Sequence, residues 1–176
     1  MVILGIDPGL ATVGWGAVEY TGSRFRPLAF GAIRTEAGLP VEERLGQIYD
    51  AHAAIIERYR PDAMAIEELF WSTNVTTGIV VAEARGVLLL CARRHGVPVY
   101  EYTPMQVKSA VVGYGKAEKR QVIAMTATML GLREPPKPDD TADALAIAIC
   151  HAHTGASALG KFYNQPTAIG GIAKKE

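Results

Sequence analysis

The sequence predicts an α/β domain built on a five-stranded mixed sheet flanked by helices. Three β-rich segments follow one another at the N-terminus with short turns between them, which favours an antiparallel meander. Strand and helix patterns then alternate, and helical crossovers imply parallel neighbours among the later strands. The chain has 176 residues, of which 49% are hydrophobic, so it is long enough for one domain with a sizeable core.

The three N-terminal strands are predicted over residues 2–7, 12–20 and 27–35. The first is a near-continuous apolar run, typical of a strand buried on both faces. It ends at Asp7, immediately before a Pro-Gly turn, and an ionised carboxylate in or beside the core is costly unless something compensates it. The second strand is interrupted by glycines, which usually permit the close approach of another backbone or a ligand, although they can also mark a bulge.

The remaining elements follow from hydrophobic spacing and from turn residues. Pro98 cannot donate to a strand ladder, which places the last strand at an edge. Two arginines and a histidine end the second long helix, where they complement the helix dipole. The predicted elements are a helix over 40–59, a strand over 63–66, a helix over 77–95, a strand over 97–102, a short helix over 103–111, a basic loop over 113–120 leading into a helix that ends at 130, and a helix over 141–153 preceded by Asp139 and Asp140. We expect residues 1–155 to form the domain and residues 156–176 to be a flexible tail.

Bulk composition excludes several classes of protein. Eighteen basic and eighteen acidic residues give a formal net charge of zero, so a nucleic-acid partner must be argued from local clusters of charge. Cys91 and Cys150 lie far apart inside apolar runs, which predicts buried free thiols in a reducing compartment. There is no apolar run of about 18 residues and no charged leader. We therefore expect a soluble, cytoplasmic protein without a membrane partner.

Acidic residues stand at three places where solubility does not require them. Asp7 and the pair Glu67-Glu68 each follow a buried strand, and Asp140 and Asp143 lie three residues apart at the start of the last helix, so they share a face. That helix is small and apolar almost all round, which predicts close packing on the sheet. If these acids converge, their repulsion would be relieved by Mg²⁺ or Mn²⁺, the hard cations that suit oxygen ligands. Two such ions about 3.5–4 Å apart are typical of phosphodiester hydrolysis.

Aromatic and basic residues near these acids indicate a nucleic-acid substrate. Phe70 and Trp71 follow Glu67-Glu68 directly; they would be unusual on a surface unless they stack on bases, and Trp71 could equally belong to the core. Four basic side chains could line one rim and contact phosphates, although a solvated helix face would also explain them. These residues are Lys108, Lys116, Lys119 and Arg120.

Several motifs together resemble the RuvC Holliday junction resolvases. They run in unbroken order from Met1 to about His153, and they are Gly5-Ile6-Asp7-Pro8-Gly9, Ala65-Ile66-Glu67-Glu68, Glu83-Ala84-Arg85-Gly86, Val111-Val112-Gly113, Ala117-Glu118-Lys119 and Asp140-Thr141-Ala142-Asp143-Ala144-Leu145-Ala146. The resemblance implies an RNase H-like fold, a homodimer, and paired symmetric nicking of four-way DNA junctions that leaves ligatable 5′-phosphate ends in recombination and repair. It also implies RuvA and RuvB as partners.

The resemblance also assigns roles to individual residues. The metal-binding catalytic acids of the family fall on Asp7, Glu67, Asp140 and Asp143, which selects Glu67 over Glu68. Phe70 stands where the family has an aromatic residue that stacks on or wedges junction bases. Lys108 and Lys119 match basic residues near the scissile strand. The segment Trp71-Ser72-Thr73 is uncharged where some relatives carry a lysine, so DNA contacts at this loop do not carry over.

Three alternatives differ from a junction resolvase in class. An actin-like kinase or ATPase would need two lobes, which 176 residues with one such strand turn cannot supply. A ribonuclease of the RNase H fold acting on an RNA precursor is the main alternative, and the aromatic pair and basic loop favour branched DNA over it. A non-catalytic binding protein would not need the set of four acids.

Overall fold

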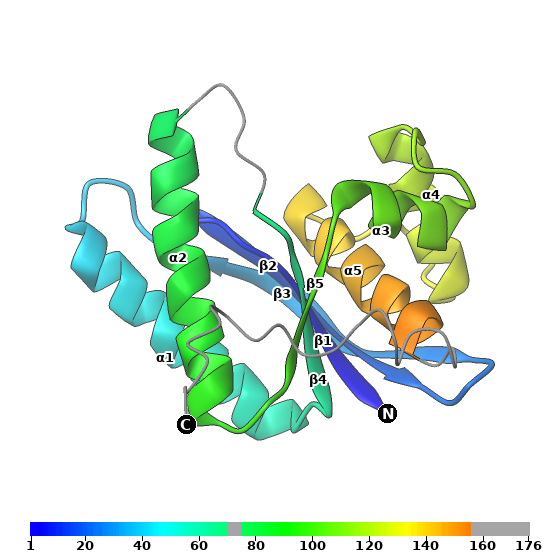
Figure 1. Ribbon diagram of the computed structural model, residues 1–176, viewed down its shortest axis with the longest axis horizontal. Coiled ribbons are helices and arrows are strands. Elements are labelled where there is room, and N and C mark those ends of the chain that lie inside the picture. Colours follow the sequence, from blue (N-terminus) through cyan, green and yellow to red (C-terminus); the bar gives the residue numbers. More distant parts are fainter. Residues whose placement is uncertain (70–74, 156–176) are drawn as a thin grey trace, which may run out of the picture.

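A computed structural model describes residues 1–69 and 75–155 of the protein. The elements, in chain order, are β1 (Val2–Asp7), β2 (Thr12–Tyr20), β3 (Phe25–Arg34), α1 (Val41–Tyr59), β4 (Ala63–Glu67), α2 (Val75–Arg94), β5 (Val99–Tyr102), α3 (Pro104–Val112), α4 (Lys119–Met129) and α5 (Asp139–Gly155). Figure 1 shows one sheet with α1 and α2 on one face and α3, α4 and α5 on the other.

The described residues form one five-stranded sheet with the order β3-β2-β1-β4-β5. β1, β2 and β3 pair antiparallel in a meander, while β1 pairs parallel with β4 and β4 pairs parallel with β5. Because β1 is central and β4 runs beside it in the same direction, these two strands end at the same edge of the sheet. The predicted mixed sheet, its antiparallel meander and the edge position of β5 are therefore confirmed.

The sheet separates two hydrophobic clusters, one on each face. Side chains alternate between the faces along a strand, so Ile3 of β1 packs with α3, α4 and α5, while Leu4 and Ile6 pack with α1 and α2. Asp7 and Glu67 continue the alternation that places Ile3 and Ala65 on the α5 face. Strand geometry alone thus directs both terminal acids toward the same helix.

Helix α5 lies almost in contact with the backbone of the sheet, and nearly all of its residues from Thr141 to Ala152 are buried. Two strand glycines allow this approach. A Cβ atom added at Gly5 would clash with the carbonyl oxygen of Ala144, and one added at Gly14 would clash with that of Asp140. The prediction that strand glycines permit close approach of another backbone is confirmed, and here that backbone carries acidic residues of the candidate site.

Several boundaries differ by one or two residues from the sequence prediction, and four of the differences have a physical cause. β3 begins at Phe25 because a register shift between Ala17 and Val18 accommodates Pro27, and this strand lies at an edge, where proline is tolerated. β5 begins only at Val99, after Pro98. α5 begins at Asp139, where the N–H of Thr141 donates to the carbonyl of Pro138.

The fourth difference concerns the predicted basic loop over 113–120. α4 begins at Lys119, so Lys119 and Arg120 belong to its first turn. The start of the helix is fixed by a capping box, in which the side chains of Glu118 and Gln121 each accept a hydrogen bond from the other residue's backbone. The two basic side chains therefore project from a helix rather than from a loop.

Other predictions concern cysteines, membranes and uncertain segments. Cys91 and Cys150 are buried free thiols, as predicted. No helix in the described part of the chain has the length and apolar character needed to cross a membrane. The aromatic pair at 70–71 and the predicted tail over 156–176 lie outside the described residues.

Candidate active site

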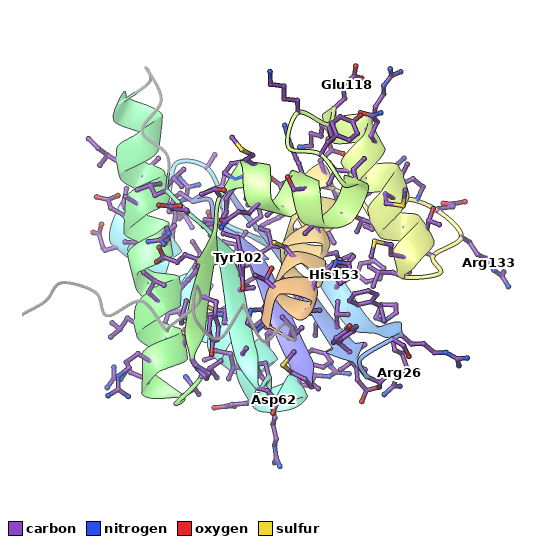
Figure 2. The ribbon with its side chains drawn as sticks, turned by 45° about the vertical axis from the view of Figure 1, so that its right-hand side comes forward. Arg26, Asp62, Tyr102, Glu118, Arg133 and His153 are labelled. Carbon is purple, nitrogen blue, oxygen red and sulfur yellow. The ribbon has the colours of Figure 1, made fainter. Side chains whose placement is uncertain are left out.

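Two of the predicted acids come from neighbouring parallel strands. Asp7 is the last residue of β1 and Glu67 is the last residue of β4, so both stand at the carboxyl edge of the sheet. In Figure 2 this edge is opposite the end marked by Asp62, which precedes β4, and on the side of Glu118, which precedes α4. Both Asp7 and Glu67 are partly buried, whereas Glu68 is exposed. The geometry thus favours Glu67 over its neighbour, as the resemblance implied.

The other two acids come from the start of α5. The backbone of Asp140 rests on Gly14 of β2, which lies opposite Asp7 in the sheet. Asp143 lies one turn further along the helix and is partly buried. The contact between α5 and the sheet therefore brings these acids to the strand ends, as the sequence predicted.

The electrostatics of Asp7 show that the four acids influence one another. The pKa of the Asp7 carboxyl is raised to about 8, chiefly by burial and then by the negative charges of Glu67, Asp143 and Asp140, with Lys119 acting in the opposite direction. The pKa of Glu67 is raised by burial and by Asp143. Without a compensating cation, ionised carboxylates at this edge are unfavourable.

Lys119 supplies part of the missing positive charge. Its Nζ lies 2.9 Å from Oδ2 of Asp143 and 3.6 Å from Oδ2 of Asp139, and the hydrogen bond with Asp143 raises the pKa of the ammonium. The two partners do not shift symmetrically, because the pKa of Asp143 is also raised: burial outweighs the ion pair. The contact with Lys119 therefore does not fully compensate the cost of burying the negative charge of Asp143.

A cavity of about 200 Å³ opens between these residues and the helices above them. Glu67, Asp143, Lys108 and Lys119 provide its polar lining, and the apolar part of the wall comes from α3, α4 and α5. Asp140 instead lines a neighbouring groove with the Gly9–Thr12 turn and Arg44. Three of the four acids thus line two hollows, Glu67 and Asp143 the cavity and Asp140 the groove.

The charges of the four acids influence one another, but their side chains do not converge on one point. Among the residues that the structure describes, no three Asp, Glu, His or Cys side chains are arranged to hold one metal ion. The chemistry of the donors nevertheless fits a hard divalent cation, since all four are carboxylates and the pKa values of Asp7, Glu67 and Asp143 are raised. A bound divalent cation would stabilise the ionised form of these carboxyls, which burial and neighbouring negative charges disfavour.

The other predicted residues add little to the geometry of the four acids. Lys116 and Arg120 are exposed, and Arg120 pairs with Glu118 at 2.6 Å. Phe70 and Trp71 lie outside the described residues. His151 and His153 have structural contacts: His151 hydrogen-bonds Tyr102 in the core and His153 contacts the Ala110 carbonyl.

Sequence reasoning assigned no role to Arg85, although it lies in one of the motifs that carried the resemblance. Its Nε donates to the backbone carbonyl of Glu67 at 3.3 Å, and its guanidinium pairs with Glu101. A sequence signal existed, because Arg85 and Glu83 are the charged residues that interrupt the apolar stretch from Ile79 to Ala92. The partners of Arg85 became visible only in the folded chain.

A mixed sheet whose central strands end in coupled carboxylates, beside a lysine-lined cavity, defines a nuclease that acts with divalent metal ions. Comparison with known proteins agrees. A family model for the crossover junction endodeoxyribonuclease RuvC matches residues 3–151. The chain belongs to this family, whose members are divalent-metal-dependent nucleases.

Individual relatives and structures support the assignment over nearly the whole chain. The chain is 60% identical to a crossover junction endodeoxyribonuclease RuvC of Brevibacillus brevis over 152 residues, which are 86% of this chain and 92% of the relative. The corresponding protein of Rubrobacter xylanophilus is 53% identical over 168 residues, covering 96% and 94% of the two chains.

The solved structures extend the comparison to the fold. The structure of T. thermophilus RuvC in complex with a Holliday junction substrate aligns with a TM-score of 0.88 at 40% identity, covering 94% of this chain and 99% of that one. A yeast mitochondrial Holliday junction resolvase shares the fold, with a TM-score of 0.61 at 16% identity. The RNase H-like fold implied by the resemblance is confirmed.

Proposed function

We propose that this protein binds four-way DNA junctions and resolves them by paired symmetric nicks, leaving ligatable 5′-phosphate ends. The observation that carries the proposal is the set of coupled carboxylates at the ends of β1 and β4 and the start of α5. Membership of the RuvC family and the likeness to a junction-bound relative support the choice of substrate. Residues 1–155 would form the nuclease domain.

The four acids would hold the catalytic metal. Asp7, Glu67, Asp140 and Asp143 supply only carboxylate oxygens, which suits two Mg²⁺ ions, with Mn²⁺ as a substitute. Bound ions of this kind activate the attacking water and stabilise the negative charge on the leaving 3′ oxygen. The protein contributes the acids already desolvated, which is why the pKa of Asp7 rises to about 8 before any cation binds.

Basic residues around the cavity would position the DNA. Lys108 and Lys119 line the cavity beside Glu67 and Asp143, where an ammonium can contact the scissile strand. Lys116 and Arg120 are exposed nearby in the chain and would contact more distant phosphates. Because phosphate contacts are screened by salt, their removal should weaken binding and reduce its dependence on salt concentration.

Phe70 would contribute a contact of a different kind. It follows the site residue Glu67 by three positions, and the family resemblance assigns it to stacking on bases at the branch point. Stacking on an aromatic ring is worth about 1–3 kcal/mol per base. Phe70→Ala should therefore weaken junction binding while leaving divalent-metal binding unchanged.

A homodimer would provide the second active site that paired nicking requires. Helix α2 presents a stripe of exposed residues that includes Ile79, Gly86 and Leu90, and their spacing places them on one helix face. Within residues 1–69 and 75–155, a Cβ atom at Gly86 would meet nothing within 4 Å, so a second helix can approach there. Sedimentation of Leu90→Glu should show a monomer, whereas Met105→Glu, at another exposed apolar position, should remain dimeric.

The family assignment also supports RuvA and RuvB as partners and the cytoplasm as the place of action. Both proteins would act on the same junction. Purified components mixed with junction DNA would test the partnership through a supershifted complex that depends on all three proteins.

A synthetic four-way junction with each arm labelled tests the central proposal. With Mg²⁺ or Mn²⁺ we expect symmetric nicks across the branch, with linear duplex and an RNA hairpin left intact. Asp7→Asn should bind the junction without cutting it, and Asp50→Asn, at an exposed position on α1, should cut normally. Equal cutting of the duplex, preference for the RNA, or normal cutting by Asp7→Asn would refute the proposal.

A further inference from the structure

The backbone carbonyl of Glu67 has no donor in the sheet on the β1 side. Ile6 lies opposite Ile66 in the parallel pair of β1 and β4. The N–H of Met64 donates to the carbonyl of Pro98, which precedes β5, so the backbone groups of Met64 face β5. Because successive residues of a strand direct their backbone groups to alternate neighbours, those of Glu67, three residues later, face β1. In this register the donor for the Glu67 carbonyl would be the N–H of residue 8. That residue is Pro8, which has no N–H.

Arg85 fills this gap from outside the sheet. Its Nε donates to the Glu67 carbonyl at 3.3 Å, and its terminal nitrogen contacts Oε1 of Glu101 at 2.5 Å. Both side chains of this ion pair are largely buried, with 13% and 22% of their surface exposed. A partly buried pair of this kind fixes the direction of a planar guanidinium more firmly than a surface pair does.

These contacts join three elements at the edge that carries the candidate site. Arg85 belongs to α2, Glu101 to β5, and the accepting carbonyl to the last residue of β4. The N–H of the next residue, Glu68, donates to the carbonyl of Tyr102 at 2.9 Å. The single peptide group that joins Glu67 to Glu68 is thus anchored at both of its polar atoms, the carbonyl oxygen by Arg85 and the N–H by β5.

We propose that Arg85 is a positioning residue that fixes the backbone of Glu67 and thereby sets the affinity of the site for divalent metal. The inference rests on the proposed role of Glu67 as a metal ligand. The carboxylate of Glu67 must approach the other acids when an ion binds, since no three of the described acids are arranged to hold one. An anchored backbone limits that movement to the side chain, which lowers the entropy lost on binding.

The measurement is a binding isotherm for Mn²⁺ without DNA, followed by the electron paramagnetic resonance signal of free Mn²⁺. We expect Arg85→Met to weaken Mn²⁺ binding by about tenfold, the lower end of the range for groups that orient metal ligands. Glu101→Gln should shift the isotherm in the same direction by a smaller factor. Arg85→Lys should fall between wild type and Arg85→Met, because one ammonium cannot reproduce the fork that contacts both acceptors.

Arg93→Met is the matched control, since Arg93 is exposed on the same helix, and it should bind Mn²⁺ like wild type. In junction cleavage, Arg85→Met should need about tenfold more Mn²⁺ for half-maximal rate and regain most of the maximal rate at saturation. Junction affinity measured in EDTA should be unchanged.

An unchanged Mn²⁺ isotherm for Arg85→Met would overturn the inference, and so would a loss of junction affinity without a change in that isotherm, because Arg85 would then contact DNA. If Arg85→Met does not fold, the Mn²⁺ isotherms of Arg85→Lys and Glu101→Gln test the inference instead. Isotherms like that of wild type for both variants would overturn it. The proposed function fails separately, when wild type neither binds Mn²⁺ nor cuts the junction.

Discussion

Replacing Asp7 with asparagine should stabilise the metal-free protein while it abolishes cleavage. In the folded chain the Asp7 carboxyl has a pKa of about 8, against 3.8 for an unperturbed aspartate, because it is buried next to other negative charges. Between these two values the unfolded chain has lost a proton that the folded chain retains. The free energy of unfolding therefore falls as the pH rises from about 4 to about 8, and it levels off above that range. Asparagine has no proton to lose and removes this dependence.

The pKa values set the size of the effect. A factor of ten in an acid dissociation constant is worth about 1.4 kcal/mol, so the rise at Asp7 gives an upper limit of roughly 5–6 kcal/mol for the gain above about pH 8. Asp7 is not fully buried and its surroundings can relax, so we expect about half of the limit, roughly 2–3 kcal/mol. At about pH 5 the gain should be smaller, roughly 1.5 kcal/mol, because the pH is then only about one unit above the pKa of the unfolded carboxyl.

Urea unfolding in excess EDTA at about pH 5 and about pH 9 measures this difference. Asp50→Asn removes an exposed acid from α1 and should change stability by less than about 0.5 kcal/mol at either pH. If Asp7→Asn were no more stable than wild type at the higher pH, or if its gain did not grow with pH, the electrostatic description of the site would be wrong.

Three further predictions concern the same fold. Mn²⁺ at about one hundred times its dissociation constant should stabilise wild type by about 2.7 kcal/mol and leave Asp7→Asn unaffected; equal shifts in calorimetric melting would show binding elsewhere. His52 is fully buried, its ring nitrogens have no hydrogen-bond partner among the described residues, and burial lowers its pKa to about 4. The free energy of unfolding should therefore fall as the pH falls from about 6.5 to about 4. His52→Leu should reduce this dependence on pH in acid unfolding and raise the free energy of unfolding by about 1 kcal/mol at neutral pH. An unchanged pH dependence in the acid range would contradict this. Gly14→Ala should lower the free energy of unfolding by about 1–3 kcal/mol, because the added methyl group meets the Asp140 carbonyl. Gly46→Ala in α1, with open space around it among the described residues, should raise it by about 0.5–1 kcal/mol. Urea midpoints that shifted in the same direction for both variants would refute the packing argument.

Local sequence patterns were sufficient for most elements of the fold. β1 and β2 have the bounds that their apolar runs predicted, since a buried strand between turn residues leaves little choice of register. Three of the differences fall beside prolines, namely Pro27, Pro98 and Pro138. Pro27 was predicted to start a strand, yet β3 begins at Phe25 because a shift in the pairing with β2 admits the proline. Such a shift depends on the partner strand and has no local signal.

The acids of the candidate site were predictable for a related reason. Asp7 and Glu67 interrupt apolar strands, and a carboxylate at such a position needs a compensating group. The local pattern of residues could not choose between Glu67 and Glu68, because adjacent residues have the same local environment, and only the family resemblance selected Glu67. Alternation in the sheet places Glu67 toward α5 and leaves Glu68 exposed, which required the pairing of β4 with its neighbours.

Sequence alone determined the kind of protein: the strand order along the chain, the acids that end two buried strands, and the motifs shared with one nuclease family. The tertiary structure decided how close those acids come and what holds them there. Gly14 brings the backbone of Asp140 onto the sheet, Lys119 pairs with Asp143, and Arg85 occupies the place left by Pro8 at the Glu67 carbonyl. Each of these contacts joins residues far apart in the chain. The physical reason is that burial and charge–charge distances, which set the pKa of Asp7, exist only after the strands and α5 have packed together.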